Sequence, residues 1–186
     1  PTSEAMAWAT KAWTTQLGEA NVLLERARIR PAQRATYPTR SKTIAVLRPA
    51  NDAQVAACLR IAAAHGVPVK PVSGGARWGL GSRVGTAPYM ALLDLSRMDA
   101  LVEVDTTLGT VTVEPGVSVA MVREQLSGTP WHLPGPSSTP YASVLGNAVD
   151  GGVCDGMVPL RRRDVLALTA VLASGEVVHT AASAWL

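Results

Sequence analysis

The residues best suited to hold a ligand form a glycine-rich run, SGGARWGLG, over residues 73–81. Consecutive glycines allow backbone conformations in which several N–H groups point to one place, and such a nest binds anions. Arg77 adds a fixed positive charge that suits a phosphate. The run is not a P-loop, because it has no Gly-Lys-Ser/Thr, and its glycine spacing is one residue too long for the dinucleotide fingerprint. It indicates diphosphate binding, and a plain wide loop is the alternative.

A second region rich in glycine and proline lies further along the chain. It starts with LPGPS over 133–137 and continues through Gly146-Asn147 and Gly151-Gly152-Val153. Prolines fix the backbone without supplying donors, whereas glycines let a ligand approach the main chain closely. A rigid connection between two lobes is the alternative here. Two such regions in one chain indicate an extended ligand held largely by backbone groups, and a dinucleotide has that shape.

Residue sets that perform acid–base, nucleophilic or metal chemistry on their own are not evident. The sequence has no Gly-x-Ser-x-Gly elbow, and Cys154 has no evident histidine partner. The three histidines form no ligand pair, so no metal is expected. Asp150 and Asp155 flank the second region, but loop aspartates usually cap turns. If the protein is a catalyst, a cofactor therefore has to supply the difficult chemistry.

The composition is that of one folded domain of ordinary to large size. The chain has 186 residues, 47% hydrophobic and 17% charged, which excludes collagen-like, disordered and disulfide-stapled classes. No run approaches the roughly 18 apolar residues of a membrane span, and the start of the chain lacks the pattern of a secretory signal. Cys58 and Cys154 stand far apart with no CxxC spacing. A reducing, cytoplasmic location without a membrane partner is therefore expected.

Basic residues gather in two stretches, 26–40 and 161–163. Nucleic-acid binding usually adds aromatic side chains for stacking, and Tyr37 is the only aromatic residue in either stretch. A solvated basic face is the favoured interpretation, and no nucleic-acid partner is expected.

The elements that position these regions alternate between helix and strand in the first third of the chain. The predicted elements are a helix over 4–17 that ends at Gly18, an irregular segment over 26–42, a strand over 43–47, a helix capped by Asn51 or Asp52 that runs to 64 and ends at Gly66, and a strand over 67–72. The last three form a β-α-β unit, which favours a parallel crossover.

The rest of the chain is richer in hairpins. It is predicted to contain a strand over 90–95, a hairpin of 101–104 with 110–113, a helix from the cap Ser118 to about 126, an irregular segment over 130–140, a helical turn over 144–149 and a hairpin of 165–173 with 176–180. We therefore expect a single α+β domain over 1–186 with two lobes. The lobe 1–96 is a small β-α-β lobe that carries the run 73–82, and the lobe 97–186 is larger, with a mixed or antiparallel sheet and flanking helices.

The order of these features resembles the FAD-binding (PCMH-type) domain of the vanillyl-alcohol oxidase and para-cresol methylhydroxylase flavoproteins. Six blocks carry the resemblance: TIAVLRPANDAQVAACLRIAAAHGVPV (43–69), SGGARWGLGS (73–82), LLDLSRMDALVEVD (92–105), VTVEPGV (111–117), LPGPSSTPYASVLGNAVDGGV (133–153) and LTAVLASGEVVHT (168–180). It extends from about residue 14 to the end and matches only the N-terminal half of such proteins. The resemblance implies two lobes with FAD between them.

The resemblance also implies which residues bind the cofactor. In the family, the loop matching 73–79 wraps the FAD diphosphate, the segment matching 135–153 runs along the flavin and ribityl side, and the strand at Val177 meets the adenine. The implied cofactor-binding residues are Pro71, Val72, Ser73, Gly74, Gly75, Ala76, Arg77, Trp78, Gly79, Gly135, Pro136, Ser137, Val144, Gly146, Asn147, Gly152, Val153 and Val177. Many relatives carry a histidine after Ser-Gly-Gly that bonds covalently to the flavin. Ala76 takes that place here, which excludes a histidyl link from this loop.

The implied function is the FAD-binding portion of an oxidoreductase that oxidises a small alcohol or alkylphenol by hydride transfer to the flavin, with no catalytic residue assigned. Relatives close to para-cresol methylhydroxylase tend to have Asp-Arg-Gly-Val where this chain has DGGV over 150–153. Family members continue into a substrate domain, for which this chain has no counterpart. A second domain, another subunit or a homo-oligomer is therefore expected as partner. The alternative is a non-catalytic flavin-fold module for binding or interaction.

Overall fold

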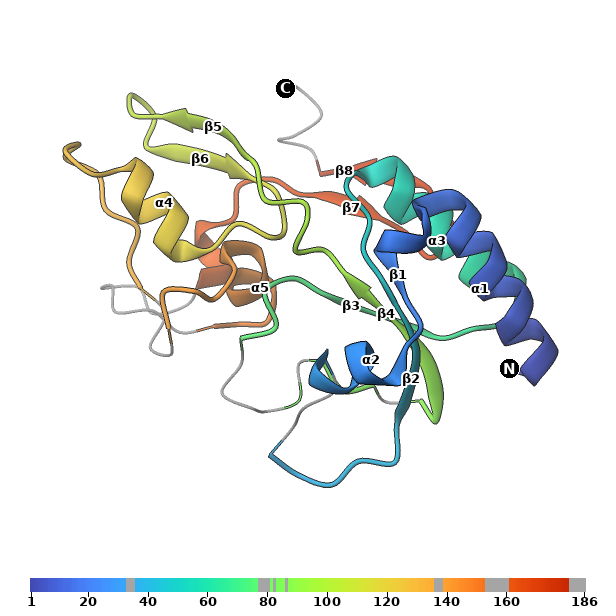
Figure 1. Cartoon of the computed structure of the whole chain (residues 1–186). Coiled ribbons are helices and arrows are strands. Elements are labelled where there is room, and N and C mark those ends of the chain that lie inside the picture. Colours follow the sequence, from blue (N-terminus) through green and yellow to red (C-terminus); the bar gives the residue numbers. More distant parts are fainter. Residues whose placement is uncertain are drawn as a thin grey trace. The chain divides into compact units, whose positions relative to one another are not determined.

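The computed structural model divides the chain into two compact units, whose elements are labelled in Figure 1. The structure describes residues 1–32, 36–76, 81, 83–85, 87–135, 139–152 and 161–180. Unit 1 consists of Pro1–Val72, Gly79–Leu95 and Ala167–Leu186, and unit 2 consists of Ser73–Trp78 and Ser96–Leu166. Both units are therefore built from segments that are discontinuous in the sequence.

A four-stranded sheet forms the centre of unit 1. Its strands are β1 (Val22–Leu23), β2 (Lys42–Leu47), β3 (Val69–Val72) and β4 (Tyr89–Asp94), in the order β1-β2-β4-β3. β2 and β3 both run parallel to β4, and β1 joins β2 in the antiparallel direction. The strands predicted near these positions are confirmed. The two strands of the predicted β-α-β unit are parallel, with β4 inserted between them.

Two long helices, α1 (Ser3–Leu17) and α3 (Asp52–Ala64), lie side by side on one face of this sheet (Figure 1). Trp13 is fully buried there, and its indole N–H donates to the Cys58 carbonyl at 3.0 Å. Asn51 caps α3 by accepting a hydrogen bond from the Gln54 N–H, as predicted. Gly18, with a φ of +80°, follows the end of α1, and a short 3-10 helix, η1 (Glu19–Asn21), follows it.

A third helix, α2 (Arg26–Ala32), lies on the opposite face. Its Ile29 joins a buried cluster formed by Val46, Val72 and Leu92, with Leu23 packed beside it. The prediction of an irregular segment over 26–42 is therefore wrong for its first part. The Glu25 carbonyl accepts the N–H groups of Arg28 and Ile29 and so starts the helix. Pro31 lies in the last turn of this helix and has no N–H to donate to a carbonyl four residues earlier, and α2 ends one residue later, at Ala32.

The closing hairpin, formed by β7 (Thr169–Val171) and β8 (Val177–His179), also belongs to unit 1. It turns at Gly175, whose φ is +81°, and Arg60 of α3 donates from Nη1 to the Gly175 carbonyl at 3.1 Å. The predicted hairpin is confirmed, with shorter strands. The contiguous division into 1–96 and 97–186 differs from these units, because the contact with α3 groups this hairpin with the N-terminal segment.

Unit 2 contains a hairpin of β5 (Leu101–Asp105) with β6 (Thr110–Val113), the helices α4 (Val119–Gln125) and α5 (Val144–Val149), and the 3-10 helix η2 (Arg161–Asp164). Ser118 caps α4 as predicted, by accepting the Met121 N–H at 3.2 Å. The predicted hairpin, helix and helical turn are confirmed. In the described part of the chain the largest sheet is the four-stranded one of unit 1.

The structure therefore has the mixed α and β architecture that was predicted. Among the described residues, no helix combines the length and the apolar character needed to cross a membrane.

Candidate functional site

The glycine run begins directly where β3 ends. Val72 is buried as the last residue of that strand, and Ser73, the first residue of the run, is partly buried. Gly75 has a φ of +68°, in the left-handed region that favours glycine. The chain therefore turns at a position where almost any side chain is strained. The structure describes the run as far as Ala76, which is exposed.

Two serine hydroxyls join the run to the start of α5. Ser73 Oγ and Ser143 Oγ lie 2.5 Å apart, and either can donate. Ser143 is only 5% exposed, and its Oγ also accepts the Gly146 N–H at 2.9 Å, which caps α5. The first residue of the glycine run and the first turn of α5 are therefore held together within unit 2.

The absence of a side chain at Gly146 makes this hydroxyl pair possible. A β-carbon on Gly146 would lie 2.5 Å from Ser143 Oγ and 2.8 Å from Ser73 Oγ, closer than such atoms pack. On Gly74 it would lie 3.6 Å from both the Ser143 nitrogen and the Tyr141 carbonyl oxygen, which is ordinary contact. Gly146 is thus required by the local packing, whereas the space at Gly74 would accept a β-carbon.

The starts of α4 and α5 support each other next to this point. The Val119 N–H donates to the Ala142 carbonyl at 3.0 Å, and the Val144 N–H donates to the Val117 carbonyl at 2.9 Å. These bonds form a β-bridge that pairs Ser118 with Ser143. Val144, predicted to bind the cofactor, is therefore fixed by its own backbone as the first residue of α5.

Asn147 carries a buried polar atom whose hydrogen-bonding capacity is unused among the described residues. Its Oδ1 is buried and has no hydrogen-bond partner among the residues that the structure describes. Gly152 closes the far side: its N–H donates to the Asn147 carbonyl at 2.7 Å, and a β-carbon there would overlap Asn147 Nδ2. A buried acceptor without a donor costs about 1–3 kcal/mol. A ligand that brings an N–H or O–H donor removes this cost, and FAD has such donors on its ribityl chain and on both ring systems.

The backbone at Gly135 lies close to the side chain of Arg123. Gly135 is buried, and a β-carbon there would lie 2.6 Å from Arg123 Nη2. Arg123 belongs to the last turn of α4, and its Nε donates to the Leu133 carbonyl at 2.9 Å. The guanidinium therefore holds the backbone that leads into the predicted flavin-side segment.

Several of the predicted cofactor residues lie close together in unit 2, and others belong to unit 1. Those that cluster in unit 2 are Ser73, Gly74, Val144, Gly146, Asn147 and Gly152. Pro71, Val72 and Val177 belong to unit 1, the last in β8. Arg77, Trp78, Gly79, Pro136, Ser137 and Val153 lie outside the described residues, so their assignment stays a prediction. Ser143 and Arg123 were not predicted; a serine three residues before Gly146 was the only sequence signal for Ser143.

The far end of the glycine run is anchored in unit 1. Lys70, in β3, donates from Nζ to the Gly81 carbonyl at 3.2 Å and to the Val84 carbonyl at 2.6 Å. Arg83 pairs with Asp94, the last residue of β4, with 3.1 Å between Nη1 and Oδ2 and side chains that are 24% and 11% exposed. Side chains of two neighbouring strands therefore hold Gly81, Arg83 and Val84.

The buried thiol of Cys58 has no place in this chemistry. Burial raises the pKa of Cys58 to about 12, so the thiol stays protonated at neutral pH and is a poor nucleophile. The other cysteine, Cys154, lies outside the described residues.

Comparison with known proteins gives consistent matches. A model of a family described as FAD binding domain matches residues 43–181. The chain is 36% identical over 174 residues to the 1'-carboxy-chondrochloren decarboxylase of Chondromyces crocatus, covering 92% of this chain and 32% of that protein. It is 27% identical over 171 residues to the flavoprotein subunit of the 4-cresol dehydrogenase [hydroxylating] of Pseudomonas putida, covering 88% of this chain and 32% of that protein.

The fold matches a solved structure as well. A crystal structure of p-cresol methylhydroxylase with substrate bound superposes with a TM-score of 0.89 at 24% identity, covering 96% of this chain and 36% of that one. The fold is therefore the one described as PCMH-type. This chain spans about a third of the length of the proteins it matches.

Proposed function

Because the chain belongs to the family of FAD binding domains, we propose that it is the cofactor-binding part of an oxidoreductase that oxidises a small alcohol or alkylphenol. FAD is the cofactor, and when bound it accepts a hydride from the substrate. One observation carries the proposal: Ser73 of the glycine run bonds to Ser143 at the start of α5, and Asn147 of that same helix has a buried Oδ1 with no partner among the described residues.

The residues of this chain bind and orient the cofactor. The turn at Gly75 aims the backbone of the run at an anion, and Arg77 supplies the positive charge that neutralises a diphosphate. Asn147 Oδ1 accepts a hydrogen bond from the flavin or the ribityl chain, and Gly152 keeps that side clear of side-chain atoms. Ala76 has no group that could bond covalently to the flavin, so the cofactor is held without a histidyl link from this loop.

The choice of substrate rests on one relative. The 4-cresol dehydrogenase subunit is named for a small phenol, and that chemistry supports an alcohol or alkylphenol as the substrate class. The other relative is named a decarboxylase, so oxidative loss of a carboxyl group from a similar small molecule is the second candidate. In either case, residues beyond this chain, from a second domain, another subunit or a second copy, have to complete the substrate side. A cytoplasmic location remains part of this proposal.

A visible absorption spectrum of the purified chain, recorded before and after acid precipitation, tests the proposal. We expect flavin bands, either as purified or after soaking with FAD, and release of the flavin into the supernatant. Flavin that stays in the pellet would show a covalent link, which this loop cannot make through a histidine because Ala76 takes that place. A chain without flavin bands even after soaking with FAD would overturn the proposal and favour the non-catalytic binding module.

A further inference from the structure

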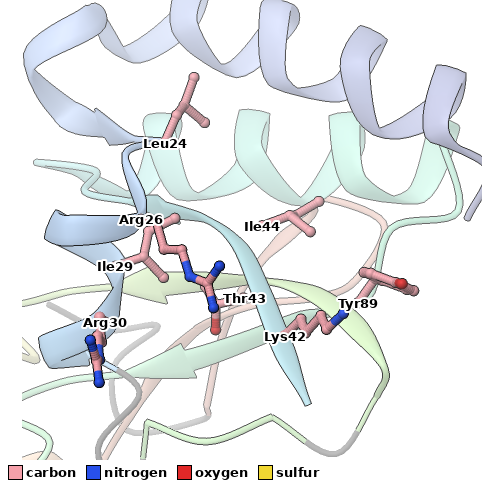
Figure 2. Close-up of a pocket in the computed structure, with 8 residues that line it drawn as sticks. All are labelled: Leu24, Arg26, Ile29, Arg30, Lys42, Thr43, Ile44 and Tyr89. Carbon is pink, nitrogen blue, oxygen red and sulfur yellow. The ribbon is translucent and has the colours of Figure 1, made fainter. Parts of the chain in front are cut away.

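A second candidate site lies in unit 1 at the edge of the sheet opposite to the glycine run. It is a pocket of about 610 Å³ between α2 and the starts of β2 and β4 (Figure 2). Lys42 and Tyr89 are register partners at the beginnings of these parallel strands, whereas Val72, which leads into the glycine run, pairs with Asp94 at the end of β4. The pocket is therefore separate from the candidate cofactor site.

The charged groups of this pocket are all positive. Arg26, Arg30 and Lys42 line it, and all three are exposed. No acidic side chain lines it, and among the described residues none forms an ion pair with any of the three. Lys42 Nζ lies 5.7 Å from the centre of the Tyr89 ring, and the two lie side by side in Figure 2. Three cations that line one pocket without an acidic side chain in its lining favour an anionic ligand over a metal ion or a neutral one.

The remaining lining is largely apolar. Leu24, Ile29 and Ile44 contribute aliphatic surface, and Ile29 belongs to the buried cluster of unit 1. Leu24 and Tyr89 leave 46% and 40% of their surface exposed. A ligand with an apolar body gains free energy by covering them.

A threonine in the lining has a hydroxyl oxygen without a hydrogen-bond partner among the described residues. Thr43 lines the pocket, is only 8% exposed, and its Oγ1 has no hydrogen-bond partner within the described part of the chain. A buried hydroxyl is usually satisfied by protein or ligand groups. A hydroxyl can donate to an anionic oxygen, although Thr43 Oγ1 is covered by other atoms in this structure.

We propose that this pocket binds a small organic anion, with its carboxylate or phosphate on Arg26, Arg30 and Lys42 and its apolar body on Leu24, Ile29 and Ile44. The volume falls within the range of pockets that hold small molecules. The cations bind the charged head group and the aliphatic side chains bind the apolar part of the ligand. An anion without an apolar part and an apolar molecule without a charge should therefore both bind more weakly.

Octanoate, octyl phosphate and neutral octan-1-ol serve as probes, each titrated by calorimetry into the FAD-saturated chain. Saturation with FAD removes the glycine run as a competing anion site. We expect octanoate to bind with a Kd below about 1 mM, and octan-1-ol to bind at least about tenfold more weakly. A tighter complex with octyl phosphate than with octanoate would identify a phosphate head group, and the reverse order a carboxylate. Amide chemical shifts should move at residues 24–30 and 42–44.

Variants locate the binding. Arg30→Gln and Lys42→Gln should each weaken octanoate about fivefold. Lys11→Gln is the matched control, because Lys11 Nζ also lies 5.7 Å from the centre of an aromatic ring, that of Trp8, but belongs to α1. The affinity of this variant for octanoate should equal that of the unchanged chain. Absence of heat and of chemical-shift changes up to about 10 mM octanoate would overturn the proposal. Equal binding of octan-1-ol, or an equal loss in the Lys11 control, would overturn it as well.

Discussion

At the scale of single residues, the missing β-carbon of Gly146 decides whether the hydroxyls of Ser73 and Ser143 can meet. We predict that Gly146→Ala displaces one hydroxyl and lowers the affinity for FAD about tenfold, because a hydrogen bond that positions the glycine run is lost. A titration of flavin fluorescence measures this. The control is Gly128→Ala in the same unit, where a β-carbon meets nothing within 4 Å. Its φ of +80° costs folding stability but should leave FAD binding unchanged.

A substitution at Asn147 should raise the stability of the FAD-free chain and at the same time lower its affinity for FAD. Leucine has nearly the same shape but no carbonyl, so Asn147→Leu removes a buried acceptor that has no partner in the described structure. We expect the FAD-free chain to gain about 1 kcal/mol in its free energy of unfolding, measured in urea. The same change should lower the affinity for FAD about tenfold or more, because the ligand loses its acceptor. Loss of stability together with unchanged FAD binding would show that Oδ1 has no role in binding.

The sequence could predict site residues only where their immediate sequence neighbours mark them. Gly74, Gly146 and Asn147 stand out in the sequence because glycines and an amide follow predicted strands and turns. The role of Ser143 depends on Ser73, which is 70 residues away. Sequence spacing contains no information about such a pair, and the same holds for the contact between Arg123 and Gly135.

At the scale of elements, the ends of the helices could be predicted because capping residues and glycines act on the backbone next to them. Gly18, Asn51 and Ser118 mark helix ends by left-handed geometry or by capping, and the structure confirms all three. β1, with two residues, is too short for a periodicity, and its place beside β2 depends on pairing across the chain. The insertion of β4 between β2 and β3 is likewise a property of the sheet and not of any one segment.

The anchoring of the glycine run by β3 leads to an element-level prediction. Lys70→Met keeps the aliphatic stem but removes the donors to the Gly81 and Val84 carbonyls. We expect amide hydrogen exchange over 81–85 to accelerate about tenfold and the affinity for FAD to fall by a similar factor, since the run then loses order that binding must restore. Lys70→Arg keeps the donors and should recover part of both. Lys11→Met controls for loss of a surface charge. Unchanged exchange in Lys70→Met would contradict the anchoring role.

At the scale of the whole molecule, the predicted cofactor residues are divided between the two units. Val177 belongs to unit 1, and Gly146 and Asn147 belong to unit 2. Both units are discontinuous in sequence, which is why a simple division at residue 96 did not describe them. If one FAD uses residues of both units, its binding has to stabilise both against unfolding.

This leads to a prediction that separates FAD from its smaller relative FMN. FAD at a hundred times its Kd should raise the free energy of unfolding by about 2.7 kcal/mol and slow amide hydrogen exchange in both units. FMN lacks the adenosine and the second phosphate, so at the same concentration it should stabilise the chain less and leave exchange in β8 unchanged. Amide hydrogen exchange, measured by mass spectrometry with each ligand, reports on both units in one experiment. If FMN protects β8 as strongly as FAD does, the adenine does not reach Val177. If FAD protects unit 2 alone, the cofactor does not couple the units.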